Sequence, residues 1–330
     1  MMSKASLSAL VLLLAGAAAS ASAGDLARRI GESSRDGATW IGWTVPSTVS
    51  GRMCCGNWRE GRSTTSRCSL KDEDVSWFRN DSEVTAHSTA RVWVRVERGE
   101  IDRIKAVSLD CDLDTSGVRF SLFEDVEPAE SVAMLAALLD EPDQGLRENA
   151  LSSIAIHATP AADELLERLL DRGTDEIRPK AAFWLASERG ARGAQAVIDR
   201  FRAEQEADVR QELTFALFVA ARDFADQTLI QAARRDPSAE VRKQALFWIA
   251  QRAGEKATAT LERTLEDDPQ SEVRQHAVFA ISQLPPERGV PLLIGLAREH
   301  RDPGVRRQAI FWLGQIDDPR ATDFLISLVE

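Results

Sequence analysis

The stretch SAEVRKQALFWIA, residues 238–250, is one of six related blocks in the second half of the chain. The others are EPDQGLRENALSSIA (141–155), TDEIRPKAAFWLA (174–186), EADVRQELTFALF (206–218), QSEVRQHAVFAIS (270–282) and DPGVRRQAIFWLG (302–314). Their arginines, spaced 31, 32, 32, 32 and 32 residues apart, are Arg147, Arg178, Arg210, Arg242, Arg274 and Arg306. This regular spacing identifies an internal repeat.

Each repeat is predicted to be a pair of short antiparallel helices. Stretches between the blocks, such as FADQTLIQAARRD (224–236), are apolar at i, i+3, i+4 and i+7. Within the block at 238–250 the predicted buried face consists of Val241, Ala245, Trp248 and Ile249. One pair cannot bury its own apolar face, so the pairs must stack into a curved superhelix with a concave surface. Residues 126–330 therefore predict an α-solenoid of six helix pairs, closed by an unpaired helix within 318–330.

These blocks resemble HEAT-like repeats, and the 32-residue unit with its VRxxA core is most similar to the phycobilisome-lyase type of HEAT repeat. The resemblance covers about residues 126–330 and implies the solenoid fold. Deoxyhypusine hydroxylase, an enzyme of such repeats, binds a di-iron centre through His-Glu dipeptides. This chain has none, because Ser88, Ala158, Ala277 and Arg301 follow its histidines, His87, His157, His276 and His300. An export signal also does not suit a cytoplasmic bilin lyase.

The first 23 residues have the pattern of a secretory signal. Lys4 gives a positive start, residues 7–19 are apolar, and Ala21-Ser22-Ala23 is a small-residue cleavage site, so the mature chain is expected to begin at Gly24. The apolar stretch is shorter than the roughly 20 residues of a spanning helix. We therefore expect an exported, periplasmic or secreted protein without membrane insertion after cleavage.

Residues 24–125 show the period-2 alternation of strands. Strands are predicted at 39–45, 90–97, 101–109 and 118–123, with hairpin turns at Arg98-Gly99-Glu100 and Thr115-Ser116-Gly117. A short helix is expected near 26–31. This region is predicted to be a small, antiparallel β domain that precedes the mainly α solenoid.

All four cysteines lie in this β region: Cys54, Cys55, Cys68 and Cys111. An even number in an exported region predicts disulfides. A bond between the adjacent Cys54 and Cys55 would be strained, so we expect one of them to bond Cys68 and the other Cys111. A zinc site is disfavoured because there is no CxxC pair.

Asp110, Asp112 and Asp114 form a DxDxD run that could supply calcium ligands. Thr115 and Ser121 stand where an EF-hand needs Gly and Glu, so solvated residues entering a turn are the favoured interpretation. No metal or cofactor is expected.

The charge is concentrated in the repeat region. Residues 24–125 carry 15 Lys and Arg against 17 Asp and Glu, whereas residues 126–330 carry 25 against 35. An acidic solenoid repels phosphate, which argues against nucleic acid and anionic membranes as partners. A neutral or basic protein is easier to accommodate.

A stripe of side chains departs from a plain repeat. Phenylalanine recurs every 32 residues at Phe183, Phe215, Phe247, Phe279 and Phe311, and the next residue is Trp in alternate units, at Trp184, Trp248 and Trp312. Polar neighbours at i±4 include Lys243, Arg307, Gln251, Gln283 and Gln315. The stripe predicts a peptide-binding ladder on the concave face. Alternatively the Phe rings pack between helices as core, and for the Trp rings, on the buried arc, core packing is the expectation.

No glycine-rich phosphate loop, GxSxG elbow, HExxH helix or CxxC pair occurs. We therefore predict a protein-interaction module without enzymatic activity, whose partner is a protein or extended peptide. The alternative is an enzyme or a metal- or ligand-binding protein with its site in the β domain, where His87 is the only histidine.

Overall fold

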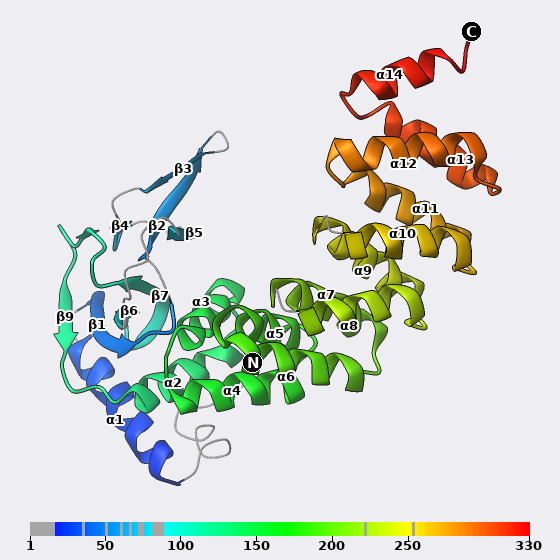
Figure 1. Ribbon diagram of the computed structural model, residues 1–330. Helices are drawn as coiled ribbons and strands as arrows, with labels where there is room; N and C mark the ends of the chain where they lie inside the picture. Colours follow the sequence, from blue (N-terminus) through cyan, green and yellow to red (C-terminus); the bar gives the residue numbers. More distant parts are fainter. Residues whose placement is uncertain are drawn as a thin grey trace, which may run out of the picture. The chain divides into compact units, whose positions relative to one another are not determined.

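The computed structural model describes residues 17–34, 37–49, 52–59, 62–65, 68–71, 76–80, 89–220, 223–252 and 255–330. The chain forms two compact units, Met1–Leu166 and Glu167–Glu330. The first unit holds the strands and the N-terminal part of the repeat region. The second unit holds the remaining repeats (Figure 1). The sequence predicted a domain boundary at residue 126, where the repeat pattern begins. That boundary remains a prediction.

The main sheet of the first unit has four strands in the order β7-β6-β1-β9. Strand β1 (Thr39–Pro46) pairs antiparallel with β6 (Thr89–Glu97), which pairs antiparallel with β7 (Glu100–Ser108). The β6–β7 hairpin turns through Arg98 and Gly99, both at positive φ, as the sequence predicted.

The last strand corrects the prediction of a purely antiparallel sheet. Strand β9 (Phe120–Phe123) pairs with β1, and in parallel. The turn at Thr115–Gly117 forms, with Gly117 at φ 66, but it does not close a hairpin onto β7. The reason is topological: residues 109–119 carry the chain across the sheet to the free side of β1, where β9 runs in the direction of β1.

The cysteine-rich segment contains strands that the sequence did not predict. Strands β2 (Arg52–Arg59), β3 (Arg62–Thr65) and β5 (Ser76–Asn80) form an antiparallel sheet, and β4 (Cys68–Ser69) pairs in parallel with β8 (Leu113–Asp114). These strands are short and polar, so alternation does not reveal them.

A disulfide joins Cys54 on β2 to Cys111, across 57 residues of chain. This bond confirms the expectation that one of the two adjacent cysteines bonds Cys111. Cys68 is also disulfide-bonded. The bonded sulfurs pack in a buried cluster on one face of the sheet with Trp40 and Trp93. The bond therefore ties the small sheet to the main one.

Helix α1 (Ala17–Ser33) packs against helix α2 (Pro128–Ala136). Leu26 and Ile30 are buried, and the Leu26 backbone N–H donates to Glu130 at 2.8 Å. Helix α1 confirms the short helix that was expected near 26–31, and it is longer than expected. It also contains the expected cleavage site, while residues 1–16 of the predicted signal lie outside the described residues. No described helix is long and apolar enough to cross a membrane.

The described part of the repeat region forms six helix pairs and a closing helix, as predicted. The first helices are α2 with the 3-10 turn η1 (Ala137–Asp140), α4 (Pro160–Arg172), α6 (Gly190–Ala203), α8 (Asp223–Arg235), α10 (Glu255–Asp267) and α12 (Pro286–Glu299). The second helices are α3 (Gln144–Ala155), α5 (Ile177–Glu188), α7 (Ala207–Val219), α9 (Ala239–Arg252), α11 (Ser271–Ser282) and α13 (Pro303–Leu313). Helix α14 (Pro319–Ile326) closes the end.

The second helices of successive pairs pack side by side, from α5 to α13, in the stack that Figure 1 shows. Val241, Ala245 and Ile249 of α9 are buried as predicted, and so is Leu246. Small residues at the Ala245 position let neighbouring helices approach. Because each second helix touches the next, residues 32 apart in the sequence become neighbours along one side of the unit.

Candidate binding surface

Each of five second helices, α5 to α13, carries a phenylalanine at the same position. We call these residues the Phe row: Phe183, Phe215, Phe247, Phe279 and Phe311. None belongs to the buried core; Phe215 is 39% exposed and Phe311 53%, and the other three are half-buried. The row therefore lies on the surface of the stacked second helices.

The rings of the Phe row touch one another across the repeats. Phe183 and Phe215 are stacked with centroids 5.7 Å apart, and Phe247 and Phe279 are stacked at 6.1 Å. Trp248 lies between these two stacks, 4.9 Å from Phe215 and 4.8 Å from Phe247. Stacked and tilted ring pairs at these distances are favourable. The rings form a continuous aromatic line whose pattern repeats every second unit.

The tryptophans were expected in the core, and this expectation is wrong in part. Trp184, Trp248 and Trp312 are half-buried, and Trp312 lies 5.1 Å from Phe279 as Trp248 does from Phe215. The physical reason is the helical rotation of about 100° per residue, which places the position after each Phe at the border of the buried arc. At that border a large indole covers the Phe ring of the preceding unit.

The spacing placed the polar neighbours on the second helices only in part, because Lys243, Gln251 and Arg307 are helical, whereas Gln283 and Gln315 lie in the turns after α11 and α13. The amides Gln251, Gln283 and Gln315 are exposed, and so is Arg307. Lys243 is half-buried and forms an ion pair of 2.7 Å with Glu240. The second helices therefore carry aromatic rings with a few polar and charged side chains, and further exposed amides follow the ends of α11 and α13.

Two residues beside the row were missed in the sequence. Phe218 stacks on Trp248 at 4.9 Å, and the Arg252 guanidinium lies 4.5 Å from the centre of the Phe218 ring. Arg252 also donates to the Phe218 carbonyl and pairs with Asp226 at 3.1 Å. A signal was present, because Phe218 stands where other copies carry Ala, Ser or Gly.

His276 is a third missed residue, 5.2 Å from the ring of Phe279. Burial, and next the positive charge of Lys243, lower the pKa of His276, while Glu240 acts in the opposite direction. Its imidazole is therefore neutral at pH 7 and adds an uncharged ring to the aromatic surface.

The repeated arginines, in contrast, hold the repeats together. Arg210 makes two hydrogen bonds of 2.9 Å to Asp236, and Arg242 does the same to Asp268 at 2.7 and 3.2 Å. We call this series the arginine ladder; its other members are Arg178 with Glu204 and Arg274 with Asp302. Each acidic partner comes 26 or 28 residues after its arginine, at the start of the next second helix.

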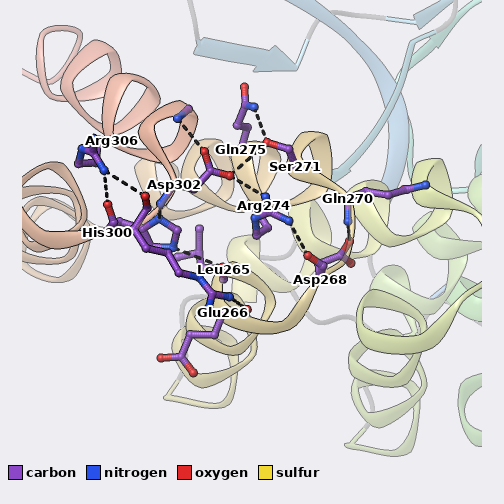
Figure 2. Close-up of polar contacts among 12 residues, drawn as sticks. Leu265, Glu266, Asp268, Gln270, Ser271, Arg274, Gln275, His300, Asp302 and Arg306 are labelled. Carbon is purple, nitrogen blue, oxygen red and sulfur yellow. Dashed lines mark hydrogen bonds and ion pairs between the residues drawn. The ribbon is translucent and has the colours of Figure 1, made fainter.

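Guanidinium groups of the repeated arginines, Arg306 included, also bond the backbone. Figure 2 shows Arg274 donating to the Asp268 carbonyl and to the Asp302 carboxylate, and Arg306 donating to the His300 carbonyl. The accepting carbonyls lie just past the ends of first helices, where backbone groups lack helical partners. The arginine ladder therefore ties the end of one first helix to the turn of the next unit.

Asp302 caps α13 and gives a testable pH dependence. Hydrogen bonds from the Arg274 side chain, and next from the Gly304 backbone N–H, lower the pKa of Asp302 to about 2, from about 3.9 in an unfolded chain. Because the folded value is the lower one, the stabilisation is fully present above about pH 4 and is lost as the pH falls through about 2.

We therefore expect Asp302→Asn to lower the urea midpoint at pH 7 and to have a much smaller effect at pH 2. Urea titrations at pH 7, 5, 3 and 2 measure this difference. The control is Asp317→Asn, at an exposed aspartate near the same end of the chain. A difference between wild type and Asp302→Asn that is as large at pH 2 as at pH 7 would contradict the assignment.

The first unit holds a polar chain inside its core. The Trp43 indole N–H donates to Ser131 Oγ at 2.8 Å, Ser131 lies 2.9 Å from His157 Nε2, and His157 Nδ1 lies 2.6 Å from the Ser153 carbonyl. A carbonyl only accepts, so Nδ1 carries the proton and Nε2 accepts the Ser131 hydroxyl. His157 and Ser131 are fully buried, so this pair is closed to a substrate and anchors α2 to β1.

The other candidates in this unit are placed as follows. Asp114 accepts the Ser116 backbone N–H at 2.8 Å, the pattern of a turn. His87 lies outside the described residues. In the ranges that the structure describes, no group of three or more His, Cys, Asp or Glu could hold a metal ion.

Comparison with known families agrees with this geometry. A family model of HEAT repeats matches residues 227–299 and 264–330. Residues 227–330 are HEAT repeats. The match does not distinguish the phycobilisome-lyase subtype, and it does not extend to the first unit. No curated protein matches the chain.

Among solved structures, the chain is similar to human deoxyhypusine hydroxylase in complex with glycerol. The two share 19% identity, the similarity covers 62% of this chain and 90% of the other, and the TM-score is 0.31. A similarity of this size says nothing about activity.

Proposed function

We propose that the second unit is a protein-interaction scaffold that binds an extended segment of another protein along the Phe row, on the concave side of the solenoid. HEAT repeats commonly mediate protein–protein interaction, because stacked helix pairs present long continuous surfaces. The proposed role is therefore binding of a partner protein and not catalysis.

The observation that carries the proposal is the exposure of aromatic rings in one line. Phe215 and Phe311 leave 39% and 53% of their surface open, and they lie on helices whose apolar faces already fill the core. Contiguous exposed apolar surface typically marks an interaction site. Aromatic rings are also the side chains that most often dominate binding energy.

The polar flanks fit an extended partner. An extended peptide has unpaired backbone N–H and C=O groups, and the exposed amides of Gln251, Gln283 and Gln315 can both donate and accept. Because residues 126–330 carry an excess of 10 acidic residues, we expect the bound segment to be neutral or basic.

We also propose that the protein acts outside the cytoplasm. The predicted secretory signal and the Cys54–Cys111 disulfide support this, since disulfides persist in oxidising compartments.

The test uses peptides of 12 residues selected from a random display library on the full chain. We expect the double variant Phe215→Ser/Phe311→Ser to weaken the selected peptides by at least about tenfold in Kd, because aromatic contacts of about 1–2 kcal/mol are lost. Isothermal titration calorimetry measures Kd, and circular dichroism checks that the helices remain.

The matched control is Phe224→Ser. Phe224 is 39% exposed, as Phe215 is, but lies on the first helix α8. Peptide binding should survive this change. Selected peptides that bind the Phe row variant and wild type equally, or a library that yields no binder, would overturn the proposal.

A further inference from the structure

The outer edge of the main sheet is open at β9. This strand pairs with β1 on one side, and no described residue pairs with its other side. Phe120 and Leu122 are 45% and 49% exposed. Sheet edges are normally protected by charges, proline or bulges. None of the four residues from Phe120 to Phe123 is charged or proline.

The open backbone groups belong to the same two residues. Phe120 is in register with Trp40, and the Trp40 N–H donates to the Arg119 carbonyl at 2.9 Å. In a parallel pair this pattern directs the backbone groups of alternate residues to the partner strand. Ser121 and Phe123 therefore direct their backbone N–H and C=O groups toward β1. Phe120 and Leu122 direct theirs outward, away from β1.

We propose that β9 is the surface through which two copies of this chain associate, by antiparallel pairing of their β9 strands. The charges around the strand favour a second copy of the chain as the partner, and they favour antiparallel pairing. Arg119 precedes the apolar segment, and Glu124 and Asp125 follow it. Antiparallel pairing sets the positive end of one copy against the negative end of the other, whereas parallel pairing would set like charges together.

The register follows from the outward residues. Phe120 of one copy pairs with Leu122 of the second copy, and each such pair exchanges both of its N–H···O bonds. Ser121 then lies opposite Ser121 on the twofold axis. This pairing covers the two exposed apolar side chains and satisfies the backbone groups at the sheet edge.

The strand has only four residues, so the interface is far smaller than the about 1,200 Å² of a stable complex. The dimer should therefore be weak, and it should appear as the protein concentration rises from about 1 µM to about 1 mM.

Sedimentation velocity of the full chain over this concentration range tests the proposal. Leu122→Pro removes an N–H that the β1 pairing does not use, so the sheet should persist while dimerisation weakens at least about tenfold. Leu109→Ser is the control, because Leu109 is 44% exposed but lies outside β9. Its dimerisation should match that of wild type.

Cross-linking tests the register. Ser121→Cys should form an oxidised dimer, because residues facing across a non-hydrogen-bonded pair are close enough for a disulfide. Ser116→Cys, in the turn before the strand, should not. The proposal is overturned if the chain stays monomeric to about 1 mM. It is also overturned if the dimer survives Leu122→Pro, or is lost only in the Phe215→Ser/Phe311→Ser variant, which would place the contact on the Phe row.

Discussion

Arg242→Ala should lower the free energy of unfolding of the second unit by about 3–5 kcal/mol. The Arg242 side chain is 7% exposed and the side chain of its partner Asp268 4%. Arg242 also donates to the Asp236 carbonyl at 2.7 Å and to Gln270 at 3.0 Å. Truncation leaves a buried carboxylate without its counter-charge and two acceptors without their donor, which costs more than the lost attraction. Urea unfolding followed by circular dichroism measures the change.

Lys243→Ala is the matched control, because Lys243 is the next residue on α9 and its partner Glu240 is 59% exposed. An ion pair this open contributes between about 0 and 1 kcal/mol. The double variant Arg242→Met/Asp268→Leu should recover much of the loss, since apolar residues can replace a buried pair. Equal effects of Arg242→Ala and Lys243→Ala would show that the arginine ladder does not hold the repeats together.

Removing the Cys54–Cys111 bond, by Cys54→Ala with Cys111→Ala, should destabilise the first unit by about 4 kcal/mol. The bond closes a segment of 57 residues, and the chain-entropy relation assigns about 4 kcal/mol to a loop of that length. It also joins β2 to the buried cluster around Trp40 and Trp93. Hydrogen exchange detected by mass spectrometry measures the loss as faster exchange in β1, β6 and β7.

The second unit is the internal control, because residues 167–330 contain no cysteine. The helices of the second unit should keep their hydrogen-exchange rates when Cys54 and Cys111 are both replaced by alanine. Unchanged protection of the main sheet would show that the disulfide does not stabilise the first unit.

The repeat architecture was predictable because its signals are local. Six blocks at a spacing of about 32 residues, each with helical periodicity, define both the helices and their order of stacking. In a solenoid each unit contacts its neighbours, so a residue's place in the block fixes its place in the fold. For the same reason the spacing of the Phe residues correctly placed them on one side of the second helices.

The sequence was less informative where partners are distant. The regular spacing of the arginines identified the repeat. It did not show that Arg210 bonds Asp236 or that Arg242 bonds Asp268. It placed Trp248 on the buried arc, whereas the ring lies at the border and covers Phe215. Periodicity assigns a side chain to an arc of its own helix and leaves open how far the next repeat covers that arc.

In the first unit the structure departs further from what the sequence predicted. Alternation located β1, β6 and β7, because half-buried strands show it locally. The parallel pairing of β9 with β1 joins residues 80 positions apart, and Ser131 on α2 contacts His157, which follows the end of α3. No local pattern encodes such contacts. The helix pairs and their repeat thus follow from short-range periodicity, whereas the open edge at β9 and the closed Trp43–Ser131–His157 chain depend on which distant segments the compact fold brings together.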